Sequence, residues 1–72
     1  MNEIIIKTEF IKLQQLLKLA GIVGQGSDAK LYINNGEVKV NGIIAIERGK
    51  KVRSGDIVTV QNIGQFKVLQ KR

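Results

Sequence analysis

The residues of this chain that can do chemistry are its cations and its glycines, because the usual catalytic residue types are missing. The sequence has no His and no Cys, so it lacks the commonest general base, the commonest metal ligand and any thiolate. Its six acidic residues are scattered along the chain, and Ser27 and Ser54 have no histidine to activate their hydroxyls. The composition therefore argues against an enzyme, a metal site and a bound cofactor.

Positive charge is the strongest chemical signal in the sequence. Twelve Lys and Arg oppose six Asp and Glu, which gives a formal charge of +6 on 72 residues. Charge of this strength favours polyanionic partners, with nucleic acid ahead of an anionic membrane surface. The densest group of cations is Arg48, Lys50, Lys51 and Arg53. Like charges in one loop repel each other, and a polyanion that neutralises them relieves that repulsion.

The first elements that must position these cations are a strand and a helix. Glu3–Lys7 is a β-branched run that predicts an edge strand. Thr8 is predicted to cap a helix that Gly21 ends, with Glu9 in its positively polarised first turn. The residues that recur at helical spacing and should face the core are Phe10, Leu13, Leu16, Leu17 and Ala20.

A second, short helix is predicted between Ser27, as its cap, and Gly36, which ends it. The preceding Gly24-Gln25-Gly26-Ser27 segment either presents backbone amides to one phosphate or is a plain tight connection between helices. Asp28 argues against a phosphate there, because its carboxylate would repel the anion unless it points away. The buried face of this helix should carry Ala29, Tyr32 and Ile33, and another face should carry Lys30 and Asn34.

The remaining chain predicts short strands. Residues 37–41 alternate between polar and apolar types, and Asn41-Gly42 is a strong signal for a tight turn. Residues 57–61 and 65–69 predict two further strands. Together these elements predict a single α+β domain over residues 1–72, in which two short helices pack on one face of a small, mostly antiparallel sheet.

The ordered set of residues resembles the S-four (S4) RNA-binding domain, also called the alpha-L motif. That pattern is an apolar helix, a Gly, a Ser-started helix with Ala and Ile, a Gly, then Val-x-Val-Asn-Gly and a later Gly-Asp. The match runs from Phe10 to Val60, through Leu13, Leu16, Leu17, Gly21, Ser27, Ala29, Ile33, Gly36, Val38, Val40, Asn41, Gly42, Gly55 and Asp56. In detail the chain is most similar to the free-standing bacterial YaaA/YbcJ-like ribosome-associated proteins, at Phe10-Ile11-Lys12-Leu13, Ala29-Lys30 and Arg48-Gly49-Lys50-Lys51.

This resemblance implies a non-enzymatic protein that binds structured RNA, above all ribosomal RNA, in ribosome assembly or function. We expect a surface made by the two helices and the flanking loops, where cations bind phosphates and polar side chains bind phosphate or 2′-OH groups. Many members have Arg directly after the helix-starting Ser, where this chain has Asp28, and Lys30 would compensate. The predicted RNA-binding residues are Lys12, Lys18, Gln25, Ser27, Lys30, Asn34, Lys39, Asn41, Arg48, Lys50, Lys51 and Arg53.

The expected partner is RNA or a ribosomal particle, with no membrane, no cofactor and no small-molecule substrate, and the free protein should be a monomer. The sequence has neither a signal-peptide pattern nor an apolar run long enough to span a bilayer, so we expect it in the cytoplasm. The alternative is a small protein-interaction adaptor with a β-grasp-like fold that pairs through an exposed strand edge. Its sulfur-carrier form would need a C-terminal Gly-Gly, whereas this chain ends in Lys71-Arg72. An enzyme subunit that borrows its catalytic residues has no sequence feature in its favour.

Overall fold

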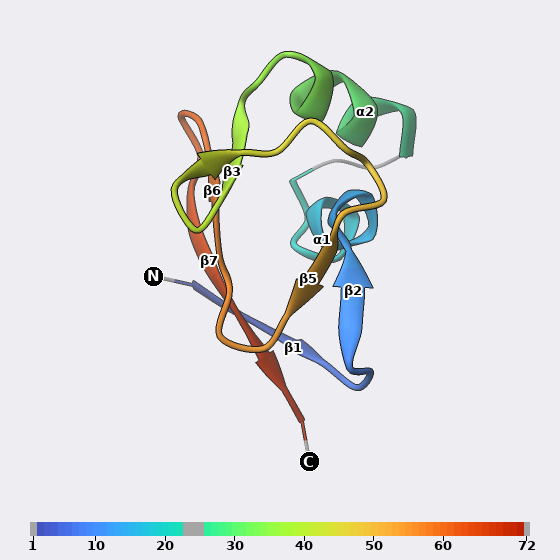
Figure 1. The fold of residues 1–72 in the computed structure, drawn as a ribbon, viewed down its shortest axis with the longest axis vertical. Coiled ribbons are helices and arrows are strands. Elements are labelled where there is room, and N and C mark those ends of the chain that lie inside the picture. The colour runs from blue at the N-terminus through green and yellow to red at the C-terminus, as the bar shows by residue number, and fades with distance from the viewer. Residues whose placement is uncertain (1, 23–25, 72) are drawn as a thin grey trace.

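The part of the chain that the structure describes folds into two helices, a five-stranded sheet and a two-stranded sheet (Figure 1). The computed structural model describes residues 2–22 and 26–71, with side chains for residues 2–22 and 29–71. The elements are β1 (Asn2–Ile6), β2 (Phe10–Lys12), α1 (Leu13–Leu19), α2 (Gly26–Asn34), β3 (Val38–Val40), β4 (Ile43–Ile44), β5 (Lys51–Arg53), β6 (Ile57–Val60) and β7 (Gly64–Gln70).

The large sheet has the strand order β1-β7-β6-β3-β4, and the small sheet pairs β2 with β5. Strand β1 lies at the edge, as predicted, and pairs with β7 in parallel. The other described neighbours are antiparallel. Two helices on a mostly antiparallel sheet confirm the predicted fold class.

The β3–β4 hairpin turns at Asn41-Gly42, as the sequence predicts. Asn41 has φ of +53° and Gly42 has φ of +83°, and two successive positive φ values are what a two-residue hairpin turn of the favoured hand requires. Val40 then pairs with Ile43 across the hairpin. Local turn chemistry therefore sets the register of this edge of the large sheet.

Helix α1 begins later than predicted. Phe10–Lys12 forms strand β2, and the helix starts at Leu13. The Thr8 hydroxyl donates a hydrogen bond to the Phe10 carbonyl oxygen at 2.6 Å, and Lys12 occupies the cap position without a side-chain cap bond. The predicted cap at Thr8, with Glu9 in the first turn, is wrong because Phe10–Lys12, which follows them, pairs with the distant strand β5 instead of continuing a helix.

Glycines end both helices where predicted. Gly21, with φ of +76°, donates its N–H to the Lys18 carbonyl, and the Ile22 N–H reaches back to the Leu17 carbonyl. This pair of bonds is a Schellman motif, which needs the left-handed backbone that glycine adopts without steric cost. Gly36 ends α2 with the same two bonds and φ of +72°.

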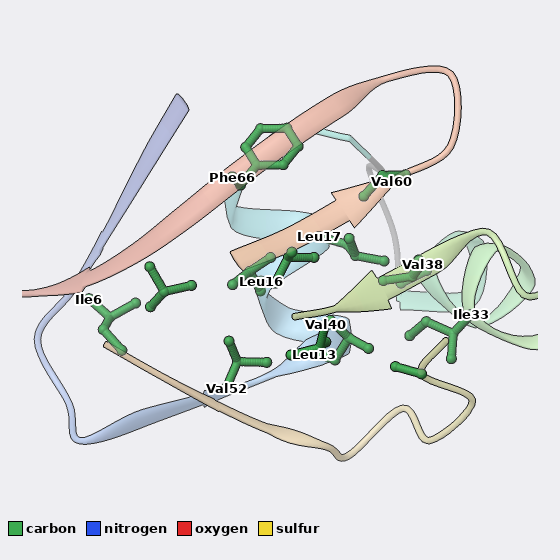
Figure 2. Close-up of a cluster of buried hydrophobic side chains, with 14 residues drawn as sticks. Ile6, Leu13, Leu16, Leu17, Ile33, Val38, Val40, Val52, Val60 and Phe66 are labelled. Atoms are coloured by element: carbon green, nitrogen blue, oxygen red, sulfur yellow. The ribbon is translucent and has the colours of Figure 1, made fainter. Parts of the chain in front are cut away.

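The core lies between the helices and the inner face of the large sheet (Figure 2). Val52 of β5 is buried with it, so the small sheet is joined to the same core. Tyr32 packs partly buried against this cluster, as predicted, and Phe66 is buried. The buried side chains include Leu13, Leu16 and Leu17 of α1, Ala29 and Ile33 of α2, and Val38, Val40, Val58, Val60 and Val68 of the sheet.

Candidate nucleic-acid interface

The small sheet has one face in the core and one face in solvent. Strands β2 and β5 pair in antiparallel register with Ile11 opposite Val52. Val52 is fully buried and Ile11 packs against the core. Because successive strand residues point to opposite faces, the neighbours of this pair point outward. The outward-facing residues are Phe10, Lys12, Lys51 and Arg53.

Phe10 lies against two of these cations rather than in the core. The Lys51 Nζ atom is 4.9 Å from the centroid of the Phe10 ring, and the Arg53 Cζ atom is 5.7 Å from it. Both distances are within the range of cation–π interactions. Phe10 is only half-buried, so its predicted place among the core residues of a helix is wrong. Its ring belongs to the charged surface.

The segment before β5 is fixed to the start of α1. The first N–H groups of a helix have no acceptor within the helix, and here two of them donate to this segment. The Leu13 N–H donates to the Lys50 carbonyl at 2.9 Å, and the Gln14 N–H donates to the Arg48 carbonyl at 3.1 Å. Figure 1 shows β2 and β5 side by side where β2 leads into α1. Backbone carbonyls thus cap a helix that lacks a side-chain cap, and they hold the cation-bearing segment in place.

These contacts bring together five cations, which we call the basic corner: Lys12, Arg48, Lys50, Lys51 and Arg53. All five side chains are exposed. Lys12 and Lys51 are directly opposite each other across the small sheet. Lys12 therefore lies in strand β2 rather than in the predicted first helix, and Lys51 and Arg53 lie in strand β5 rather than in the predicted loop. The arrangement suits binding of phosphate groups, because five cations that extend from two adjoining segments of backbone make a concentrated positive field that attracts a polyanion.

Asn41 and Asp56 link the hairpin turn to the turn after β5. The Asn41 Nδ2 group donates to Asp56 Oδ1 at 3.1 Å, and the Ile57 N–H donates to Asn41 Oδ1 at 2.9 Å. The Arg53 N–H donates to Asp56 Oδ2 at 2.9 Å. The side chain of Asn41, a predicted RNA contact, thus has partners within the protein, and the network fixes the backbone that carries Arg53.

The other predicted contact residues come from other elements. Lys18 is exposed in the last turn of α1, and Lys30 and Asn34 are exposed on α2. Lys39 is exposed between the buried residues of β3, so it points away from the helices on the outer face of the large sheet. The structure therefore does not place Lys39 on the side of the sheet that the helices cover.

For two of the predicted residues the structure gives no side chain. Gln25 lies outside the described residues, and for Ser27 the structure describes only the backbone, which belongs to α2. Because α2 begins at Gly26, Ser27 lies inside the helix and not at its cap, so the predicted cap at Ser27 is wrong. The two interpretations of the glycine segment stay predictions.

The sequence matches the family model described as S4 domain over residues 4–69. The chain belongs to this family. A similar protein is the probable ribosome maturation protein RlbA of Bacillus subtilis (strain 168), which is 41% identical over 68 residues, or 94% of this chain and 96% of the relative. The solution structure of YbcJ from E. coli is 30% identical, with a TM-score of 0.73 over 96% of this chain and 87% of YbcJ. That structure is described as revealing an alpha-L motif involved in RNA binding.

Within this S4 domain, the sequence pattern pointed to every cation of the basic corner but not to Phe10. The ring stands at helical spacing from Leu13, and this spacing favoured a core position. The alternation of Phe10, Ile11 and Lys12 was the available signal for a strand, but three residues are too few to decide between periods of two and 3.6.

The described residues of this S4 domain offer few other sites for chemistry. Residues 2–22 and 26–71 contain no group of three or more acidic residues arranged to hold a metal ion. In the same part of the chain, neither helix has the length and apolar character that crossing a membrane requires. The basic corner is therefore the candidate site that the described structure supports best.

Proposed function

We propose that this S4 domain binds structured RNA, ribosomal RNA in particular, without catalysing a reaction, and that it acts in ribosome assembly or function. The observation that carries this proposal is the basic corner, where a helix start and a two-stranded sheet hold the backbone of five exposed cations close together. The name of the Bacillus subtilis relative and the RNA-binding motif of YbcJ support it.

The proposed mechanism is electrostatic capture followed by recognition of backbone shape. Structured RNA is recognised largely through its phosphates and 2′-OH groups. If each cation of the basic corner neutralises one phosphate, the logarithm of the affinity should fall against the logarithm of the salt concentration with a slope of roughly −3.5 to −4.5. Lys18, Gln25, Ser27, Lys30 and Asn34 are proposed to add contacts that extend the surface beyond the corner. Lys39 lies on the outer face of the large sheet, and the side chain of Asn41 binds Asp56 and the Ile57 N–H, so neither is part of this proposed surface.

We further propose that RNA is the partner in the cytoplasm and that the protein is a monomer when free. The proposal includes no small-molecule substrate and no cofactor. It is supported by the ribosome-related name of the relative and by the charge of +6, which opposes self-association through like-charge repulsion.

The test compares two triple variants that remove the same charge from different places. One is Lys50→Ala, Lys51→Ala and Arg53→Ala. The other is the control, in which the exposed Lys7, Lys67 and Lys71 outside the corner are changed to Ala. Each variant loses three of the six net positive charges. Filter binding to deproteinised ribosomal RNA is measured over a range of salt concentrations.

The corner variant should bind more weakly, and its salt slope should be shallower than that of the wild type by about 2 to 3. The control should stay close to the wild type. A wild-type affinity that hardly changes with salt would contradict RNA binding through phosphates. Equal weakening of the two variants would show that overall charge, not the basic corner, is responsible.

The protein-interaction adaptor remains a second candidate because of strand β4. This edge strand exposes Ile43 and Ile44, which are 73% and 53% accessible to solvent. An apolar edge strand can pair with a strand of another protein. Affinity purification with and without nuclease treatment separates the two functions. Partners that remain after the RNA has been digested would favour the adaptor, and partners lost with the RNA would favour the RNA-binding protein.

A further inference from the structure

We infer that Phe10 is a positioning residue for Lys51 and Arg53: its ring holds the two cations ready for neighbouring RNA phosphates without neutralising them. This inference rests on the proposed function, and it assigns a role to a residue that carries no charge and no hydrogen-bonding group. Its evidence is the geometry of the outward face of the small sheet.

The register of the small sheet places the ring within reach of both cations. Arg53 is directly opposite Phe10, and Lys51 is two residues before Arg53 on the same face. Side chains directly opposite and diagonal to each other across an antiparallel pair are close enough to touch. The 4.9 Å and 5.7 Å distances from the ring centroid to Lys51 Nζ and Arg53 Cζ show that both contacts are made.

An aromatic ring can restrain two cationic side chains without cancelling their charge, which a carboxylate cannot do. Two long cationic side chains on one strand face repel each other and have many rotamers, so an unrestrained pair loses conformational entropy when it binds a phosphate. A carboxylate would restrain them but would also cancel charge that the RNA needs. The electron-rich face of Phe10 attracts a cation through its quadrupole, and each cation keeps its full charge for the phosphate.

The same geometry argues against the other uses of an exposed aromatic ring. A base that stacked on Phe10 would have to displace cations that already lie over the ring. A purely structural role is also a poor fit, because the inward position of β2 is Ile11 and the ring is only half-buried. In a double-mutant cycle, the positioning role makes a different prediction from both of the other roles.

The experiment compares Phe10→Leu, which keeps an apolar side chain but removes the ring, with Phe10→Tyr, which keeps the ring. Binding to deproteinised ribosomal RNA is measured at low salt, and thermal unfolding shows whether each variant is folded. Phe10→Leu should bind roughly three- to tenfold more weakly than the wild type. Phe10→Tyr should bind within about twofold of the wild type, because the quadrupole of the ring is retained.

The cycle then repeats Phe10→Leu in two backgrounds. In the double variant Lys51→Ala, Arg53→Ala, loss of the ring should not weaken RNA binding further, because there is no cation left to position. In Lys12→Ala the full effect should persist, since Lys12 shares the outward face but its charged group has no contact with the ring among the interactions described. A stacking or structural role would instead give the same loss in every background.

These outcomes separate this inference from the proposed function. The positioning role would be overturned, and RNA binding left intact, if Phe10→Leu bound RNA as tightly as the wild type while the double variant Lys51→Ala, Arg53→Ala bound it weakly. A wild-type protein that does not bind ribosomal RNA at all would overturn both. Loss of affinity that is confined to backgrounds with Lys51 and Arg53 present would support the inference.

Discussion

Asn41 both forms the hairpin turn and helps to hold the backbone of the basic corner. Its positive φ suits Asn better than most residues, because a short polar side chain tolerates the left-handed region. Its amide group meanwhile joins Asp56 and the Ile57 N–H across two turns. Asp56 in turn accepts the N–H of Arg53, so a residue of the hairpin acts on the backbone of the basic corner.

We predict that Asn41→Ala lowers the free energy of unfolding by roughly 2–4 kcal/mol, from two lost hydrogen bonds and a strained φ. Asn62→Ala is the matched control. Asn62 also has a positive φ, of +65°, but its side chain has no hydrogen bond to another described residue, so its loss should be only about 1–2 kcal/mol. Urea unfolding measures both variants. Equal losses would show that the network around Asn41 contributes nothing.

At the scale of elements, the start of α1 and the basic segment before β5 depend on each other. The helix has neither a side-chain cap nor an acidic residue in its first turn, so the carbonyls of Arg48 and Lys50 take over the capping of its first N–H groups. The same two bonds hold the backbone from which Arg48 and Lys50 extend. Helix capping and presentation of the cations are thus two results of one contact.

Deletion of Gly49 should break this contact, because it shortens the segment between the two capping carbonyls. We expect the free energy of unfolding to fall by about 1–3 kcal/mol, the cost of leaving helix N–H groups without partners. The Leu13 and Gln14 amides should also lose protection from hydrogen exchange. Gly49→Ala is the control: its added Cβ would meet nothing within 4 Å, so its effect should stay within about 0.5 kcal/mol. Continued protection in the deletion variant would contradict the capping role.

Elements whose ends depend on local residues could be predicted from the sequence, whereas the start of α1, which depends on distant residues, could not. Gly21, Gly36 and Asn41-Gly42 act through their own backbone conformation, and each helix end or turn lies where its residues indicated. The start of α1 depends on a strand that pairs Phe10 with Arg53, a partner far along the chain. No local pattern contains that pairing, so the helical spacing of Phe10 was misleading. The cations were predictable as a group from charge, whereas the ring that holds two of them was not.

In the molecule as a whole, the first and the last strand of the described chain pair with each other. Strand β1, near the N-terminus, pairs along its length with β7, near the C-terminus. Figure 1 shows these two strands crossing below the helices and beside the small sheet. Ile6 of β1 and Ile33 of α2 both belong to the buried cluster. A core that draws on so many elements should unfold as one unit, in keeping with the single domain that we propose.

Two probes can test this cooperativity. Tyr32, the one tyrosine in a chain without tryptophan, reports on α2 by fluorescence, whereas far-ultraviolet circular dichroism reports on the whole backbone. Ile6→Val and Ile33→Val should each lower the midpoint of urea unfolding by about 0.2–1.5 M, from losses of roughly 0.5–1.5 kcal/mol. The two probes should shift together. The control Ile63→Val, at an exposed position, should shift neither. If Ile33→Val moved only the Tyr32 transition, α2 would unfold separately from the sheet, and the proposal of one cooperative domain would be wrong.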